Sequence, residues 1–158
     1  PTRFGSEIKG LGFSPSPLSL QPAYETTSWV EKPADPPCPC GAGARYATCC
    51  GRWHEGNLPL TAPTPEALMR SRYSAHVFGL HDYLLATWHP RTRPLSIAPQ
   101  PPGLVWIGLQ VRRCVALDDD HATVEFVARS KLGGRADRMH VTSRFERVEG
   151  RWLYVDDA

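Results

Sequence analysis

The sequence predicts an α+β fold, in which helices come first and an antiparallel sheet follows. Two observations predict it. Apolar residues recur at helical spacing through 64–80. From residue 105 onward, alternating segments of strand-like composition are separated by short turns rich in glycine or aspartate. This order favours a long helix packed across the concave face of a curved, four-stranded antiparallel sheet, with a second, shorter helix beside it.

Both predicted helices have recognisable ends. Thr64 is an N-cap residue type, and a proline follows it at the first helical position. Gly79 is the residue type that commonly ends a helix. The second helix is predicted over 83–88, with Asp82 as its cap. It must end before the proline at position 90, because a residue that precedes proline disfavours the helical conformation.

Four strands are predicted over 105–117, 122–131, 139–148 and 151–156. In the first of them the odd positions are apolar apart from Arg113, which predicts that these apolar residues form its buried face. The preceding stretch, 91–103, contains four prolines and is a predicted loop. Its length leaves room for a functional lid.

The chain divides by composition into three parts. Residues 1–37 carry seven prolines and no sustained apolar period, so they are predicted to be a disordered tail. Residues 38–53 contain a dense cysteine motif and form a small knuckle. Residues 64–158 make up the α+β domain.

Composition excludes several classes of protein. The 18 basic and 16 acidic residues give a net charge of only +2, whereas a nucleic-acid-binding domain usually carries a strongly basic stripe. No apolar run approaches the roughly 20 residues of a membrane span. The first residues lack the pattern of a signal peptide. A cytosolic location is therefore expected.

Four of the five cysteines lie in the segment CPCGAGARYATCCG. The spacing C-x-C-x8-C-C brings two pairs of thiolates together, and zinc prefers four such ligands in a tetrahedron. Free or disulfide-bonded cysteines are the alternative, but a bond between adjacent cysteines is strained. The sequence therefore predicts one metal ion, zinc or iron. Its ligands are Cys38, Cys40, Cys49 and Cys50.

The knuckle is too short to have a core of its own. Gly41 and Gly43 allow tight turns, and residues 44–48 can form a helical turn that returns the second cysteine pair. Ligation must then supply the folding free energy, which is on the order of 10 kcal/mol for structural zinc. We therefore expect the knuckle to unfold separately from the α+β domain. His54 is not needed as a ligand, and the isolated Cys114 is expected to be a buried apolar side chain.

The cysteine segment resembles the SEC-C motif, the metal-binding tail of the SecA motor. The glycine-flanked C-x-C, the eight-residue spacer and the final Cys-Cys-Gly all match. Further matches to the YchJ family are LMRSRYSAHVFGLHDYLLATWHP, FVARS, SRF and GRWLYVDD, at 68–90, 126–130, 143–145 and 150–157. This resemblance implies a nuclear-transport-factor-like (cystatin-like) cone after the knuckle. It also implies contact with the secretion chaperone SecB or the ribosome.

Candidate pocket residues follow from their chemistry and predicted positions. Arginines suit an anionic ligand, and a histidine can act as acid or base near neutral pH. The same arginines can instead be solvated or pair with carboxylates, the tryptophan can be core, and the histidine can cap a helix end. The candidates are Arg72, Tyr73, Trp88, His89, Arg144 and Asp156.

Two hypotheses for function follow. The first is a non-enzymatic, metal-stabilised binding module whose knuckle recognises a partner and whose cone binds a peptide, a protein or a small anion. The second is an enzyme or small-ligand binder that uses the cavity, with His89 and either Asp82 or Asp156 as an acid–base pair. Under either, Arg72 and Arg144 are expected to approach each other near the concave face, although simple alternation along the strand would place Arg144 outside.

Overall fold

The computed structural model describes residues 35–55 and 61–158, which belong to one compact unit of the chain. The predicted tail therefore lies outside the described residues, apart from its last three positions. Among the described residues, no helix has the length and apolar character needed to cross a bilayer. The elements are η1 (Tyr46–Thr48), α1 (Gly51–His54), α2 (Pro65–Phe78), α3 (His81–Ala86), β1 (Val105–Ala116), β2 (His121–Leu132), β3 (Arg135–Val148) and β4 (Arg151–Asp157).

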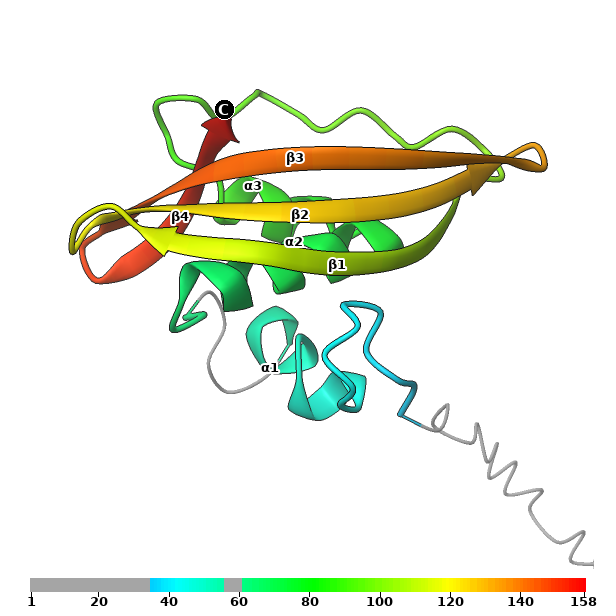
Figure 1. Ribbon diagram of the computed structural model, residues 1–158, viewed down its shortest axis with the longest axis horizontal. Coiled ribbons are helices and arrows are strands. Elements are labelled where there is room, and N and C mark those ends of the chain that lie inside the picture. The colour runs from blue at the N-terminus through cyan, green and yellow to red at the C-terminus, as the bar shows by residue number, and fades with distance from the viewer. Residues whose placement is uncertain (1–34, 56–60) are drawn as a thin grey trace, which may run out of the picture. The chain divides into compact units, whose positions relative to one another are not determined.

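The four strands form one antiparallel sheet in the order β1-β2-β3-β4. Figure 1 shows that the sheet curves and that α2 and α3 lie together on one of its faces. This arrangement confirms the predicted α+β fold with two helices on a curved four-stranded sheet. Because each strand pairs with its neighbour in sequence, every connection within the sheet is a hairpin.

The ends of α2 are those that its sequence predicts. The Thr64 hydroxyl accepts a hydrogen bond from the backbone N–H of Ala67 at 3.1 Å, and Gly79 ends the helix in the left-handed conformation with φ of 68°. Helix α3 begins and ends two residues earlier than predicted. Asp82 consequently lies in its first turn rather than at its cap.

The core lies between the helices and the inner face of the sheet. Phe145 of β3 is 1% exposed, and Leu84 of α3 is fully buried. The same cluster of buried side chains continues into the cysteine knuckle. Its members include Cys38, Cys40, Cys50, Trp53, Leu68, Met69, Tyr73, Leu84, Val124, Phe126 and Phe145.

Strand β1 departs from simple alternation. Register shifts fall between Trp106 and Gly108 and between Val111 and Arg113. Each irregularity changes which side of the strand the following residues occupy. As a result Ile107 is 56% exposed, and Trp106 instead packs against the core. The prediction of a continuous buried face on the odd positions is wrong for this reason, and the predicted burial of Cys114 is wrong as well, because it is exposed.

The long connection between α3 and β1 is tied to the domain at both ends. Thr92 donates a hydrogen bond to the carbonyl of Val155 at 2.6 Å. Gln100 donates from Nε2 to the carbonyl of His76 at 2.9 Å and accepts from Trp106 Nε1 at 3.2 Å. These hydrogen bonds attach both ends of the predicted loop to β4, α2 and β1.

Candidate functional site

The four knuckle cysteines converge in space. Their sulfur atoms all lie within 4.8 Å of one another, and Cys40 Sγ lies 3.6 Å from Cys49 Sγ. A tetrahedral zinc ion with Zn–S bonds of about 2.3 Å places its sulfurs about 3.8 Å apart. Three of the cysteines are buried and Cys49 is half-buried. The donor set and its spacing therefore fit a metal ion held by thiolates.

A small hairpin presents the first cysteine pair. The N–H of Cys38 donates to the carbonyl of Ala44 at 2.9 Å, and Pro37 and Arg45 form an antiparallel bridge. Gly41 and Gly43 have φ of 76° and 84°, a conformation that other residues rarely adopt. The prediction that these glycines turn the chain is confirmed.

The second cysteine pair stands between two short helical segments. The 3-10 turn η1 leads into Cys49 and Cys50, and α1 starts directly after them at Gly51. A Cβ atom at Gly51 would lie 2.7 Å from the carbonyl oxygen of Tyr46, which is backbone and cannot swing aside. The glycine that closes the cysteine motif is therefore required by the tight return of the chain.

Without a cation the four thiols cannot all ionise. Hydrogen bonds from Cys40 and Cys50 lower the pKa of Cys38. Burial, followed by hydrogen bonds with Cys40 and Cys38, raises the pKa of Cys49 to about 11. Hydrogen bonds with Cys38 and Cys40 raise the pKa of Cys50. A divalent ion would supply the charge that allows the remaining protons to leave.

The knuckle is docked on helix α2. Cys38 Sγ lies 3.6 Å from Ser74 Oγ, and Arg70 Nη1 donates to the carbonyl of Cys40 at 2.7 Å. On the other side, His54 Nε2 lies 2.8 Å from the carbonyl of Ser71 and its Nδ1 lies 2.7 Å from the hydroxyl of Tyr46. These bonds attach the knuckle to α2, and its buried side chains share the core of the α+β domain. The expectation of separate unfolding assumed that the knuckle has little core to share, and that assumption is wrong.

Ser74 is fully buried and contacts one of the candidate ligands, so it should influence metal affinity. We expect Ser74→Ala to bind zinc about tenfold more weakly, since it loses a group that orients the ligand. Competition with a chromophoric chelator measures this. Ser143→Ala is the matched control, because Ser143 is 1% exposed and bonds Asp157 instead of a cysteine. Equal affinities in the two variants would show that Ser74 does not support the site.

A second feature is a cavity of about 200 Å³ between α2 and the sheet, which is partly open to solvent. Three of the candidate pocket residues, Arg72, Tyr73 and Trp88, line it. Arg72 is only 4% exposed, and its Nη1 donates to the carbonyl of Leu84 at 2.8 Å and to Thr87 Oγ1 at 2.7 Å. Burial lowers the pKa of Arg72 to about 10, which still leaves it charged at neutral pH.

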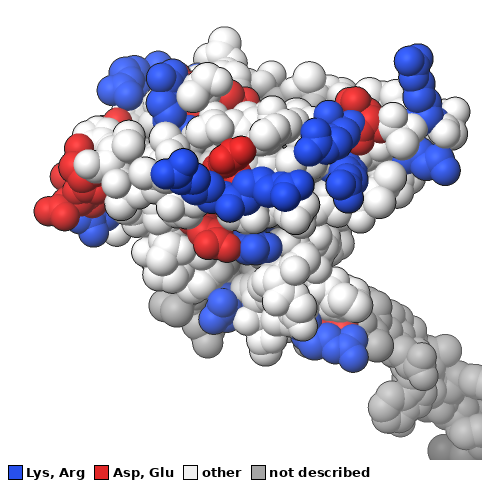
Figure 2. Space-filling model, in the orientation of Figure 1, with Lys and Arg blue, Asp and Glu red and all other residues white. Residues whose placement is uncertain are grey.

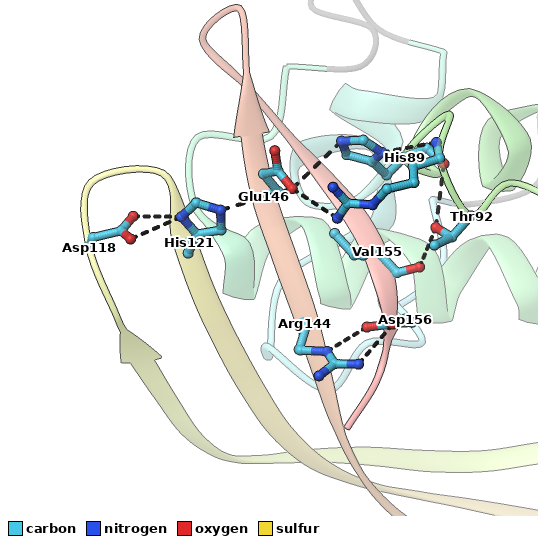
Figure 3. Close-up of polar contacts among 9 residues, drawn as sticks. His89, Thr92, Asp118, His121, Arg144, Glu146, Val155 and Asp156 are labelled. Atoms are coloured by element: carbon cyan, nitrogen blue, oxygen red, sulfur yellow. Dashed lines mark hydrogen bonds and ion pairs between the residues drawn. The ribbon is translucent and has the colours of Figure 1, made fainter.

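Arg144 and Asp156 do not line this cavity; Figure 3 shows their side chains facing each other. The Arg144 guanidinium forms a two-point ion pair with Asp156, at 2.6 and 2.8 Å, in an exposed depression that does not contain Arg72. Their neighbours Ser143 and Asp157 line the cavity instead, because successive residues on a strand face opposite sides. The expected approach of Arg72 and Arg144 is therefore wrong.

His89 has a structural environment outside the cavity. Its Nδ1 accepts a hydrogen bond from the backbone N–H of Arg91 at 3.0 Å, which leaves the proton on Nε2. That nitrogen faces Glu146 at 3.6 Å, rather than Asp82 or Asp156 (Figure 3). The proposed acid–base pairings of His89 with these two aspartates are not formed.

Sequence reasoning missed several residues around these sites. His76, Ser143 and Asp157 line the cavity, and Glu146 faces both His89 and His121. His121 also pairs with an aspartate three residues before it, and this hydrogen bond raises its pKa. The three-residue spacing between this aspartate and His121 is the only one of these contacts that the sequence could have indicated. The other contacts depend on packing between elements that are far apart in the chain.

Comparison with known families matches both parts of the chain. The family model described as YchJ, middle NTF2-like domain, matches residues 64–157, and the SEC-C motif matches residues 37–52. A UPF0225 protein of Bordetella parapertussis is 54% identical over 129 residues, which cover 80% of this chain and 97% of that protein. A UPF0225 protein of Methylibium petroleiphilum is 58% identical over 125 residues, covering 79% and 90% respectively.

Solved structures resemble the chain as well. A SEC-C motif containing protein from Rhodopseudomonas palustris has a TM-score of 0.66 and 32% identity, over 77% of this chain and 96% of that one. A sec-c motif containing protein from Psychrobacter arcticus has a TM-score of 0.62 and 28% identity, covering 76% and 79%. The matched domain, the motif and the relatives agree with the resemblance found in the sequence. The chain therefore belongs to the YchJ-like family of UPF0225 proteins, which join a SEC-C motif to an NTF2-like domain.

Proposed function

We propose that this protein is a non-enzymatic binding module whose knuckle holds one structural zinc ion. The convergence of four cysteine sulfurs within 4.8 Å carries the proposal. Four thiolates complete the coordination shell of zinc and leave no open position for a substrate or an attacking water. Iron also accepts four thiolates, so elemental analysis has to distinguish the two metals.

The exposed side of the knuckle is the proposed recognition surface. Residues 41–45 are exposed, as is Arg52, whose guanidinium lies 4.7 Å from the centre of the Trp53 ring. Zinc with four thiolates would carry a charge of −2, which the basic side chains Arg45 and Arg52 offset. Such a surface favours a protein partner over a nucleic acid.

The distribution of charge over the domain also favours a protein partner over a nucleic acid. In Figure 2, basic and acidic side chains are interspersed over the strands, with no continuous basic surface in this view. Arg147 pairs with Asp120 and His140 with Glu125 among the exposed pairs of the sheet. A partner of the kind implied by the SEC-C motif, such as the chaperone SecB, fits this surface better than ribosomal RNA. A cytosolic location is proposed with it, because four free thiols persist in a reducing compartment.

Metal analysis and partner capture test the proposal together. Protein purified under reducing conditions should contain about one zinc ion per chain, and Cys40→Ser combined with Cys49→Ser should remove it. Cys114→Ser is the matched control and should retain the metal, because Cys114 is exposed and outside the knuckle.

A partner captured by the native protein should be lost with Arg45→Glu combined with Arg52→Glu, although these variants keep their zinc. A metal content near zero would contradict the zinc site, and capture unaffected by both sets of changes would contradict recognition by the knuckle.

A further inference from the structure

We propose that the cavity between α2 and the sheet is a second binding site, which accepts a small organic carboxylate with a planar, apolar body. Arg72 would bind the carboxylate, and the aromatic walls would bind the body. The site lies in the NTF2-like domain and uses none of the knuckle cysteines. It goes beyond the proposed role of the metal knuckle.

The first argument is a buried positive charge without a matching carboxylate. Arg72 is 4% exposed, and its printed hydrogen bonds go to a neutral carbonyl and a neutral hydroxyl, both through Nη1. Its Nε and Nη2 have no hydrogen-bond partner among residues 35–55 and 61–158, nor does an acidic group there form an ion pair with it. Buried charges are ordinarily paired, and a guanidinium matches a carboxylate through two parallel hydrogen bonds.

The second argument is an unused donor beside the guanidinium. Trp88 also lines the cavity, and its indole Nε1 is buried with no hydrogen-bond partner within the described part of the chain. Buried polar groups without a partner are rare and call for an explanation. The Arg72 guanidinium carbon lies 5.1 Å from the centre of the Trp88 ring and 4.4 Å from that of Tyr154. The two rings hold the guanidinium in place beside the cavity, and an acceptor bound there would pair with Trp88 Nε1 only after a local shift of the indole, because that atom has almost no accessible surface.

The third argument is the size and lining of the cavity. A cavity of about 150 Å³ lined by apolar side chains accepts benzene, so about 200 Å³ admits a single ring with a carboxylate. Trp106, Phe126 and Met139 supply apolar walls. Burial lowers the pKa of His76 to about 4, so this neighbour is neutral at pH 7 and adds no competing charge.

Asp157 determines how selective the site is. It also lines the cavity, and its Oδ1 accepts hydrogen bonds from Ser143 at 2.7 Å and Tyr154 at 3.0 Å. Its charge favours the protonated form of Arg72 but does not reach it as an ion pair. An anion bound in this cavity would therefore lie near a carboxylate that repels it. Neutralising Asp157 should strengthen anion binding, whereas neutralising Arg72 should abolish it.

The test uses benzoate as the probe and the tryptophan indole N–H signals in two-dimensional NMR as the readout. The chain has five tryptophans, so the signal of Trp88 can be assigned with Trp88→Phe. Benzoate at pH 7 should shift the Trp88 signal in a saturable manner, whereas the uncharged benzamide should bind at least tenfold more weakly. Arg72→Met should weaken benzoate binding at least tenfold, and Asp157→Asn should strengthen it severalfold. Arg144→Met is the matched control and should bind as the native protein does, because Arg144 lies outside the cavity.

Every outcome of the benzoate experiment either supports or contradicts the proposed carboxylate site. Should Arg72→Met fail to fold, Asp157→Asn still shows whether charge governs binding, because it should strengthen the binding of benzoate and leave that of uncharged benzamide unchanged. No saturable shift with benzoate, equal binding of benzamide, or equal weakening in Arg144→Met and Arg72→Met would overturn the proposal. Zinc content, measured in the same samples, keeps the outcome separate from that of the metal knuckle.

Discussion

Removing the metal should lower the thermal midpoint of the whole described domain, and not only disorder the knuckle. Cys38, Cys40 and Cys50 belong to the same buried cluster as Leu68 and Phe145, so losing the knuckle exposes part of the shared core. Structural zinc contributes on the order of 10 kcal/mol in small zinc domains. Even a third of that would lower the midpoint by roughly 10 °C or more, since each kcal/mol shifts a domain of this size by several degrees. Calorimetry before and after chelation measures the change.

Hydrogen exchange locates the effect of chelation. Amides of β2 and β3 should lose protection together with residues 38–53, and added zinc should restore both. Cys114→Ser serves as the control and should respond to chelation as the native protein does, since its exposed thiol takes no part in the cluster. Loss of protection confined to 38–53, with an unchanged midpoint, would show that the docking contacts on α2 contribute little free energy.

Truncating Phe145 should cost about 3–5 kcal/mol of unfolding free energy. Its side chain is 1% exposed, and its ring lies 5.9 Å from that of Tyr154 in an edge-to-face arrangement. Phe145→Ala would leave a cavity in the buried core, where the surrounding strands cannot collapse fully. Urea denaturation of Phe145→Ala measures the loss through the midpoint at constant slope.

Phe78→Ala is the matched control for this substitution. Phe78 is 43% exposed and meets Tyr46 of the knuckle edge to face, with ring centres 4.8 Å apart. Its truncation should cost only about 1 kcal/mol, mainly from the lost ring contact. Comparable losses in both variants would mean that Phe145 does not occupy the centre of the core.

Local chemistry explains which features the sequence predicts well. A cap such as Thr64, a left-handed Gly79 and a closely spaced cysteine motif are properties of a few adjacent residues, and the structure has them as predicted. Strand β1 shows where such reasoning ends. The apolar residues of β1 alternate regularly, but its register shifts arise from pairing with β2. The sequence of β1 alone does not predict them.

The candidate pocket shows the same limit on a larger scale. Arg72 was identified by type, and its burial in the cavity follows from helix α2 packing on the sheet. The sequence groups Arg144 with it, whereas in the structure Nε and Nη2 of Arg144 form an exposed ion pair with Asp156. Partners such as Asp157 and His76 come from elements far apart in the chain, and their meeting depends on tertiary packing.

The strand order has a consequence for how the chain is made. The knuckle and α2 leave the ribosome before any strand, whereas the strands that contact α2 follow later, as β1, β2 and β4. Because each strand pairs with the one before it in the sequence, this topology would allow the sheet to be completed one hairpin at a time as the chain is made. The four cysteine ligands lie close together in the sequence and precede the strands, so they can bind a metal ion before the sheet forms. If the nascent chain has already bound its metal, the folded knuckle and α2 would provide a surface against which the strands can pack.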